Sequence, residues 1–566
     1  MRFVDCCEML DRISKTPKRL EKTDLVVELL QKTPKKDLPT VMMLLKGRVF
    51  PEWDDHQLGV SDKLVIKAIA LASGESEAVV VQQLKKIGDL GEVAGKLLNK
   101  KKQHTLTSSE LTVSDVAQTI KKLALLEGTG SVDQKLKLIA QLYGNATPLE
   151  SQFISRILLE DLRIGIADGT IRDAIILYAG EKTEEWIGAV QDAIDCSNDV
   201  ARVAIVAKED GVAGLKKIGL TIGSPIKVML AQRESAITDA LNRVGRPAAV
   251  EFKYDGFRMQ IHKKDDHVTL FTRRLENVTV QFPEVVDLVR LSIKEDCILD
   301  AEAVGFDPKT KKYRPFQDVS QRIRRKYDII GLAKELPVEI NVFDILQIDG
   351  RAMYLQPFHE RRAILEKIIP HKKLQLLPSH LRIVSDDDGA NAVYQESLAA
   401  GNEGIMVKTL DAPYKPGSRV GFMVKLKPVL DAYDVVIIGA EWGEGKRSGW
   451  LTSFMFACLG EDGEFLELGR LGTGLKELEQ DGGTTFDQLT ELLKPHIIAE
   501  SGKEVKIRPK VVIEVKCEEI QKSPSYSSGY ALRFPRFVRL RDDRRPDEIT
   551  TIDEIQEVYA HQRGRS

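Results

Sequence analysis

A short motif around Lys253 combines a potential nucleophile with acidic and basic side chains. The motif reads KYDGFR over residues 253–258. A lysine amine attacks an electrophile only when it is deprotonated, and the pKa of a free lysine is ~10.4. Nearby cations lower that pKa, and Arg258, Lys425, Lys427 and a bound metal ion are the candidates for this effect. The motif is short enough to occur by chance, and a lone lysine is usually a surface charge, so the case depends on its companions.

Further motifs rich in charged residues follow in a fixed order. They are FTRR at 271–274, LDAE at 299–302, VFD at 342–344, EGIMVK at 403–408, KLK at 425–427, RFPRF at 533–537 and RDDR at 541–544. This ordered set resembles the nucleotidyltransferase superfamily, which contains DNA ligases, RNA ligases and mRNA-capping enzymes. The whole chain is most similar to the archaeal-type ATP-dependent, replicative DNA ligases, because the resemblance extends to residues 50–53, 162–166 and 315–327.

The resemblance implies an enzyme that seals nicks in duplex DNA during replication, repair and recombination. Lys253 would attack the α-phosphate of ATP, release pyrophosphate and carry AMP. The AMP would pass to the 5′-phosphate of the nick, and the 3′-hydroxyl would then displace it. All three steps are displacements at phosphorus, so we expect positioning and charge neutralisation to dominate the catalysis.

The same resemblance implies roles for individual residues. Phe343 would stack on adenine and Glu251 would contact the adenine side, although Phe343 taken alone would read as a core residue. Glu302 would contact the ribose or a metal-bound water, and Glu403 would help to bind Mg²⁺, which suits carboxylate and phosphate oxygens. The remaining nucleotide-binding candidates are cations: Arg258, Arg273, Arg419, Lys425, Lys427 and Arg541.

Three departures from the family pattern stand out. Relatives often have Trp-x-Lys-x-Lys where this chain has Met423, and the last motif usually ends in Asp-Lys where this chain has Arg544. Archaeal relatives can also carry a glutamine-led motif with an aromatic pair that binds a sliding clamp. Residues 103–106 read QHTL and lack the aromatic pair, so a clamp remains an open partner.

Two other classes of protein compete with this interpretation. A capping guanylyltransferase or an RNA ligase would share the lysine motifs but would lack the long helical N-terminal region. A nonenzymatic, helical nucleic-acid scaffold would have no use for Lys253 and its companion motifs. NAD is disfavoured as the AMP donor, because NAD-dependent ligases carry zinc-type cysteines that this sequence lacks.

The predicted fold is multidomain α+β, with boundaries at 218 and 429. Residues 1–218 form an all-α DNA-binding domain, 219–429 an α+β adenylation domain, and 430–566 a β-barrel of the OB type. In the helical region, apolar residues from Val116 repeat at helical spacing, with Ser114 as the predicted N-cap and Gly128 as the stop. Thr147 begins a capping box that predicts another helix start.

Alternating residues predict strands around the lysine. Apolar residues fall on even numbers in 250–254 and on odd numbers in 257–261, which predicts two strands joined by a tight turn at 255–256. That arrangement would place Glu251, Lys253 and Asp255 on one face. Asp300 and Glu302 should share a face of a later strand. Strands are also expected at 434–438, 454–458, 464–468 and 511–515.

Composition limits the remaining possibilities. Net charge is −2, but basic residues cluster at 100–102 and 322–326, and six arginines lie in 533–545. Local basic faces could hold a DNA backbone, although each run alone would read as solvated surface. The apolar runs are too short for a membrane span, and no signal peptide is evident. We expect a cytoplasmic, nucleoid-associated monomer with six free thiols and no structural zinc.

Overall fold

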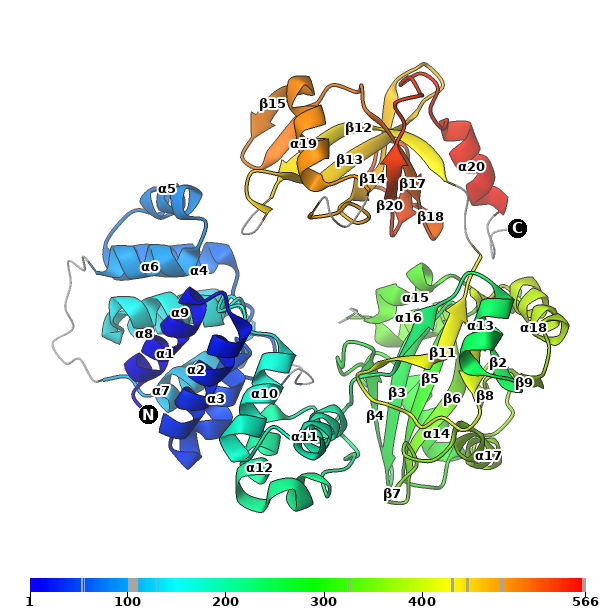
Figure 1. Cartoon of the computed structure of the whole chain (residues 1–566), viewed down its shortest axis with the longest axis horizontal. Helices are drawn as coiled ribbons and strands as arrows, with labels where there is room; N and C mark the ends of the chain where they lie inside the picture. Colours follow the sequence, from blue (N-terminus) through cyan, green and yellow to red (C-terminus); the bar gives the residue numbers. More distant parts are fainter. Residues whose placement is uncertain are drawn as a thin grey trace.

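The computed structural model describes residues 1–51, 54, 56–99, 110–128, 130–323, 325, 327–428, 432–443, 447–478 and 483–561. Three parts follow one another along the chain. A helical part lies on one side, a part built on two sheets lies on the other, and a C-terminal sheet part lies above them (Figure 1). This order agrees with the predicted architecture, while the boundaries at 218 and 429 stay predictions.

The helical part packs around one apolar core that runs from Phe3 to Ile218. Its helices are α1 (Phe3–Lys15), α2 (Arg19–Lys32), α3 (Leu38–Leu45), α4 (Asp62–Ser73), α5 (Glu77–Ile87), α6 (Leu90–Leu98), α7 (Val113–Ala124), α8 (Ser131–Asn145), α9 (Pro148–Leu158), α10 (Asp168–Ala179), α11 (Glu184–Ser197) and α12 (Val200–Leu215). The basic run at 100–102 and the segment 103–106 lie outside the described residues.

Helix caps confirm one sequence prediction and correct another. The Thr147 side chain accepts from Glu150 N while the Glu150 carboxylate accepts from Thr147 N, so the predicted capping box at the start of α9 is present. The start of α7 was predicted at Ser114, but its N-cap is Thr112. Thr112 forms a capping box with Asp115, which satisfies two helix-end N–H groups and outcompetes a lone serine. The α7 helix also ends at Ala124, before Gly128.

The central part contains two sheets. One has the order β1-β11-β10-β2-β9, and the other has the order β4-β3-β5-β6-β7 with β8 beside β6. The strands are β1 (Leu230–Arg233), β2 (Ala248–Lys253), β3 (Phe257–Lys264), β4 (His267–Thr272), β5 (Cys297–Gly305), β6 (Val338–Ile348), β7 (Arg351–Ala352), β8 (Leu376–Pro378), β9 (Leu381–Val384), β10 (Gly404–Thr409) and β11 (Arg419–Leu426). The helices are α13 (Ile237–Val244), α14 (Pro283–Ser292), α15 (Phe316–Ile323), α16 (Ile329–Glu335), α17 (Phe358–Ile368) and α18 (Asp387–Ala399).

The predicted strands around Lys253 are confirmed, but their pairing as a hairpin is wrong. β2 pairs with β9 and β10, whereas β3 pairs with β4 and β5. Ala248 and Val250 of β2 pack in one apolar cluster, and Met259 and Ile261 of β3 pack in another. The change of parity therefore marks the point at which the chain leaves one core for the next, and Lys253 lies at that junction.

The C-terminal part is mainly an antiparallel sheet. Its order is β14-β13-β12-β16-β15, with β17 between β12 and β20, and β18 and β19 form a separate pair. The elements are β12 (Tyr433–Trp442), β13 (Leu451–Leu459), β14 (Phe465–Leu471), α19 (Phe486–Leu493), β15 (Ile497–Ser501), β16 (Glu504–Ile507), β17 (Val512–Lys516), β18 (Glu519–Lys522), β19 (Tyr530–Arg533), β20 (Arg536–Leu540) and α20 (Ile552–His561). The four predicted strands are all present, and closure of the sheet as an OB barrel stays a prediction.

The helical and central parts meet through α11. Cys196 of α11 donates a hydrogen bond to the Tyr354 hydroxyl over 3.3 Å, and it shares an apolar cluster with Leu346 and Tyr414. Asp168 at the start of α10 pairs with Lys227 over 2.9 Å. This junction joins the helical part directly to the wall of the cavity described below.

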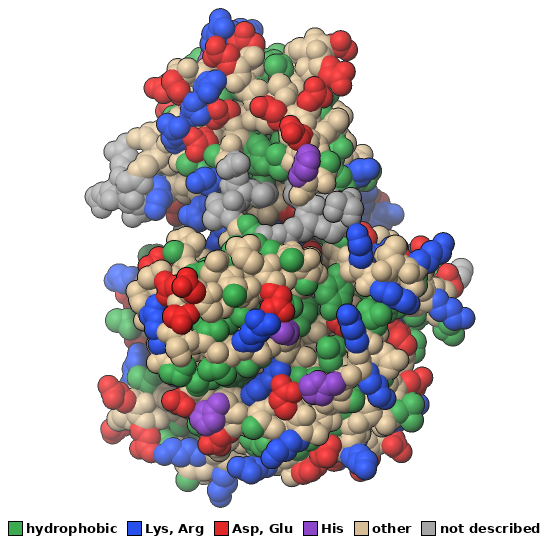
Figure 2. All heavy atoms as spheres, turned by 90° about the vertical axis from the view of Figure 1, so that its right-hand side faces the viewer, with side chains coloured by type: hydrophobic (Ala, Val, Ile, Leu, Met, Phe, Trp, Pro, Cys, Tyr) green, Lys and Arg blue, Asp and Glu red, His purple; other side chains and the backbone are tan. Residues whose placement is uncertain are grey.

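Charges of both signs are mixed on the face formed by the central and C-terminal parts (Figure 2). In the basic runs at 322–326 and 533–545, some arginines form ion pairs within the protein. Arg322 is 1% exposed, and it pairs with Glu284 and donates to backbone oxygens. Arg539 pairs with Glu514 over 2.8 Å. The cysteines are buried free thiols. Among the described helices, none is long and apolar enough to cross a membrane.

Candidate active site

A cavity of about 930 Å³ lies beside Lys253 and is lined by both central sheets and by residues of the C-terminal part. All but one of the residues assigned from the sequence to catalysis, nucleotide binding or metal binding line it: Glu251, Lys253, Arg258, Arg273, Glu302, Phe343, Glu403, Arg419, Lys425 and Lys427. The exception is Arg541. Segments far apart in the chain thus supply one concave site, which is the usual form of a small-molecule pocket.

Lys253 is held at the last position of β2, opposite Gly404 of β10. Its carbonyl oxygen accepts a hydrogen bond from Glu403 N over 2.8 Å, and its Nζ lies 2.7 Å from Glu403 Oε2. Burial by itself lowers the pKa of Lys253, but the carboxylates of Glu403, Glu302 and Asp255 outweigh burial and raise it. This direction is opposite to the lowering expected from neighbouring cations, because the Glu403 carboxylate lies in contact with the amine.

Glu403 connects two of the lysines that line the cavity. Its Oε2 lies 2.7 Å from Lys427 Nζ as well as from Lys253 Nζ. Burial raises the pKa of Glu403, yet Lys253 and Lys427 outweigh this effect and hold it below its usual range. Lys427 also reaches Glu518 of the C-terminal part, over 3.2 Å. A single line of charges therefore runs from the candidate nucleophile to the neighbouring domain.

Glu302 has a different environment from Glu403. Burial raises the pKa of Glu302 to about 7, against the opposing effect of Lys253 and Arg258, and Glu403 and Asp300 raise it further. A metal cation bound in the cavity would reduce the repulsion between these carboxylates. Among the described residues, no three His, Cys, Asp or Glu side chains gather to hold a metal. A metal bound here would need oxygen ligands from the substrate, as Mg²⁺ commonly uses.

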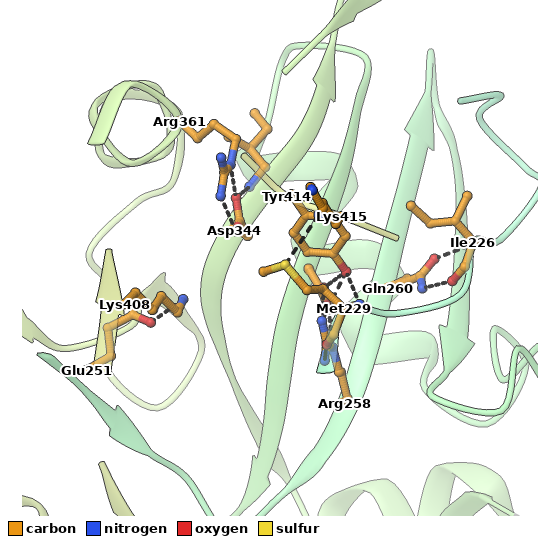
Figure 3. A network of polar contacts seen from close by, with 12 residues as sticks. Ile226, Met229, Glu251, Arg258, Gln260, Asp344, Arg361, Lys408, Tyr414 and Lys415 are labelled. Carbon is orange, nitrogen blue, oxygen red and sulfur yellow. Dashed lines mark hydrogen bonds and ion pairs between the residues drawn. The ribbon is translucent and has the colours of Figure 1, made fainter. Parts of the chain in front are cut away.

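Phe343 and Glu251 form the apolar end of the cavity. Phe343 is only half-buried on β6, while its neighbours in the strand are buried, so its ring faces the cavity and not the core. The cations of Arg258 and Lys408 lie over this ring, each 5.2 Å from the centroid. Glu251 is 2% exposed and forms an ion pair with Lys408 (Figure 3). Its Oε1 accepts from Ser379 over 2.9 Å.

The rim of the cavity and β11 supply the remaining cations. Arg273 and Arg419 are exposed at the edge of the cavity, and Arg419 donates to Ala231 O over 3.0 Å. Burial lowers the pKa of Lys425, and repulsion from Lys427 and Lys253 lowers it further. These cations surround a space that suits a strongly negative ligand.

Two residues lie elsewhere than the sequence predicted. Asp255 follows β2 and lines a second cavity of about 440 Å³, not the face shared by Glu251 and Lys253. Arg541 lies in the C-terminal part, where its Nη1 is 2.7 Å from Asp434 and its Nε is 2.8 Å from Asp543. Arg539 and Arg541 both lie near Glu514, at 2.8 Å and 3.7 Å.

The cavity also contains residues that were not singled out. Arg533, Phe534 and Glu518 reach it from the C-terminal part. Arg533 lies over the ring of Phe534, at 5.2 Å. These two residues belong to the RFPRF motif, which offered a signal, whereas Glu518 lies in no motif. Met423, which replaces an aromatic residue, lines the cavity with 6% of its surface exposed.

Comparison with known proteins gives consistent matches. Residues 228–427 match the family described as ATP dependent DNA ligase domain, residues 2–176 the DNA ligase N terminus, and residues 447–544 the ATP dependent DNA ligase C terminal region. The chain is 49% identical to a DNA ligase of Nanoarchaeum equitans, over 100% of this chain and 99% of that protein. It is 43% identical to a DNA ligase of Thermococcus onnurineus, over 99% of this chain and 98% of that protein. The solved structure Pmar-Lig_PreS3 shares the fold, with a TM-score of 0.59 and 16% identity. The match covers 95% of this chain and 99% of that one.

Proposed function

Because the chain belongs to the family of ATP-dependent DNA ligases, we propose that Lys253 is the residue that carries AMP and that the cavity beside it binds ATP. Enzymes of this family seal nicks in DNA through a lysine–AMP intermediate and a 5′-adenylated DNA intermediate. The observation that carries the assignment is the position of Lys253. Its amine lies in a concave site that also holds an aromatic ring and several cations.

Adenine binding is assigned to the apolar end of the cavity. The face of Phe343 suits stacking with a base, because aromatic rings prefer offset, parallel contacts. Glu251 is buried and fixed by Lys408 and Ser379, so its carboxylate has a defined position. A carboxylate accepts hydrogen bonds, which favours a base that presents an amino group, as adenine does, over one that presents a carbonyl oxygen.

The phosphates are assigned to the cationic end. The cations proposed to meet the phosphates are Lys425, Lys427, Arg419 and Arg273, which all line the cavity. Before ATP binds, Lys427 is shared between Glu403 and Glu518. We infer that the triphosphate takes over the interaction with Lys427, because a polyphosphate carries more charge than a single carboxylate. The cations then neutralise charge on the phosphorus centre that the amine attacks.

Glu302 and Glu403 are the residues proposed to hold Mg²⁺. Burial raises the pKa of Glu302 against the opposing effect of Lys253 and Arg258, and a bound cation would likewise favour the charged form of this carboxylate. Bound Mg²⁺ would supply charge neutralisation at the phosphates. Glu403 could then leave Lys253, which would remove the main interaction that keeps the amine protonated.

The enzyme acts on nicked DNA, and three finer features remain proposals. The helical part would supply much of the grip on the duplex, through the phosphate backbone and without sequence preference. We also propose that the enzyme is a monomer and works in the cytoplasm on nucleoid DNA. Binding to a sliding clamp through residues 103–106 is not proposed, since that segment lacks the aromatic pair.

Incubation of the purified chain with radiolabelled ATP or GTP, Mg²⁺ and nicked duplex DNA tests the proposal. We expect a protein–AMP adduct with ATP, no adduct with GTP, and a sealed strand. A labelled adduct with GTP alone would instead indicate a capping-type guanylyltransferase.

Replacement of Glu403 by alanine should raise the Mg²⁺ concentration that gives half-maximal adduct formation by about tenfold or more, because one of two proposed carboxylate ligands is lost. The exposed Glu360→Ala variant on α17 is the control and should keep the wild-type curve. A wild-type Mg²⁺ dependence for Glu403→Ala would show that Glu403 does not serve the metal.

A further inference from the structure

The Arg258 guanidinium is held on several sides before any nucleotide binds. Its Nε donates to Asp300 Oδ1 over 2.9 Å, and its Nη1 donates to Met229 O over 2.7 Å. Its Nη2 donates to the Tyr414 hydroxyl over 3.0 Å and also to Asp300. Arg258, Met229 and Tyr414 converge from different segments in Figure 3. A guanidinium fixed in this way presents a defined face to the cavity, where it lies over the ring of Phe343.

Tyr414 uses the full capacity of its hydroxyl in this arrangement. The group donates its one proton to Asp300 Oδ2 over 2.7 Å and accepts from Met229 N over 3.1 Å and from Arg258 Nη2. A phenolic hydroxyl offers one donor and two acceptor positions, so all are satisfied. Tyr414 is 1% exposed and Asp300 0%, so no water can replace these bonds without a rearrangement.

The hydroxyl joins segments that are distant in the sequence. Tyr414 lies between β10 and β11, Met229 directly precedes β1, Arg258 lies on β3 and Asp300 lies on β5. β1 and β11 belong to one sheet, and β3 and β5 belong to the other. The contact therefore sets the position of Arg258 relative to both walls of the cavity.

We propose that Tyr414 is a positioning residue for ATP binding, and that its hydroxyl fixes the Arg258 guanidinium against Asp300 and Met229 so that Arg258 meets the nucleotide. The proposal rests on the function proposed above, in which Arg258 contacts ATP. Tyr414 itself acts through Arg258 and not on the reacting atoms.

Tyr414→Phe removes the hydroxyl and keeps the ring in the apolar cluster. We expect the KM for ATP in adduct formation to rise about tenfold or more, because a hydrogen bond to a charged group is lost and a buried N–H is left without its acceptor. The rate at saturating ATP should change less than about threefold, since the amine and the phosphate-binding cations stay in place. The measurement is single-turnover adduct formation over a range of ATP concentrations.

Tyr354→Phe is the matched control. Tyr354 packs against the same apolar cluster, and its hydroxyl accepts from Cys196, but it does not line the cavity in the part of the chain that the structure describes. Its loss should leave the KM for ATP unchanged. If Tyr414→Phe merely reduced the fraction of folded enzyme, the amount of adduct formed would fall with an unchanged KM, and that result would overturn the proposal.

A double-mutant cycle tests whether the effect passes through Arg258. Arg258→Lys should itself raise the KM, because an ammonium group cannot contact Asp300, Met229 and Tyr414 from one rigid plane. Tyr414→Phe should then add little in the Arg258→Lys background. An equal, additive increase there would overturn the proposal, as would an unchanged KM for Arg258→Lys. Failure of the wild-type chain to form any adduct would overturn the proposed function itself, so the two failures are distinguishable.

Discussion

Lys253→Ala should form no detectable AMP adduct, a loss of at least about a thousandfold, because the nucleophile itself is removed. The neighbouring Lys427 is engaged by Glu403 and Glu518 and lies directly after β11, so it is not placed as a substitute. Intact-protein mass spectrometry after incubation with ATP and Mg²⁺ measures the adduct directly. The exposed Lys264→Ala variant on β3 should form it normally.

A second substrate separates the loss of the amine from a loss of fold. A nick that already carries a 5′-AMP needs only attack by its own 3′-hydroxyl, so Lys253→Ala should still seal it at a measurable rate. An adduct of unchanged yield on the alanine variant would show that another residue is the nucleophile. Loss of all activity on the pre-adenylated nick, together with a lowered unfolding temperature, would indicate a folding defect.

Arg541→Ala should slow formation of the AMP adduct by about a hundredfold, the usual cost of removing one group that stabilises developing charge. Sealing of a pre-adenylated nick should fall by less than about tenfold, because pyrophosphate leaves only in the first step. Arg541 is held away from the cavity by Asp434 and Asp543. The proposed role of Arg541 therefore requires that the C-terminal part reorient to bring Arg541 over the nucleotide and then move away to admit DNA.

Asp434→Asn is the control for Arg541, because it weakens the ion pair in the C-terminal sheet and leaves the guanidinium intact. We expect near-normal adduct formation from this variant. A loss as large as that of Arg541→Ala would mean that the ion pair supports the fold of the C-terminal part. Equal losses of Arg541→Ala in both assays would mean that Arg541 acts through DNA binding or folding.

Local sequence patterns predicted the elements well and their long-range pairing poorly. Alternation located β2 and β3 because alternate residues of each strand pack in an apolar cluster, and the capping box located α9 because its bonds are local. The predicted hairpin was wrong because the shift of apolar residues from even to odd positions at Asp-Gly has two explanations. It occurs when two strands pair in one sheet, and it also occurs when two strands pack in different cores. Only the partners β9, β10, β4 and β5 distinguish these cases.

The candidate site was predictable where its residues lie in motifs and not where the contact is purely spatial. Motif order brought Lys253, Glu302 and Glu403 to attention, and they do line one cavity. Glu518 and Tyr414 were missed because nothing near them in the sequence signals that they reach Lys427 and Arg258. The pKa direction of Lys253 also differs from the expected one, because counting nearby cations in the sequence does not reveal that Glu403 contacts the amine.

The position of Lys253 at the junction of two sheets has a consequence for how the enzyme is made. Ala248 of β2 pairs with Val384 and with Thr409, both far along the chain. Pairings between such distant segments form slowly, since a long loop must close, and lose entropy, before any contact offsets that loss. A ribosome must therefore synthesise the chain beyond Thr409 before the strand that carries Lys253 can be enclosed on both sides. Until then a nascent chain would have a folded helical part and an exposed, unpaired β2, which is the stage at which we expect aggregation and dependence on chaperones to be greatest.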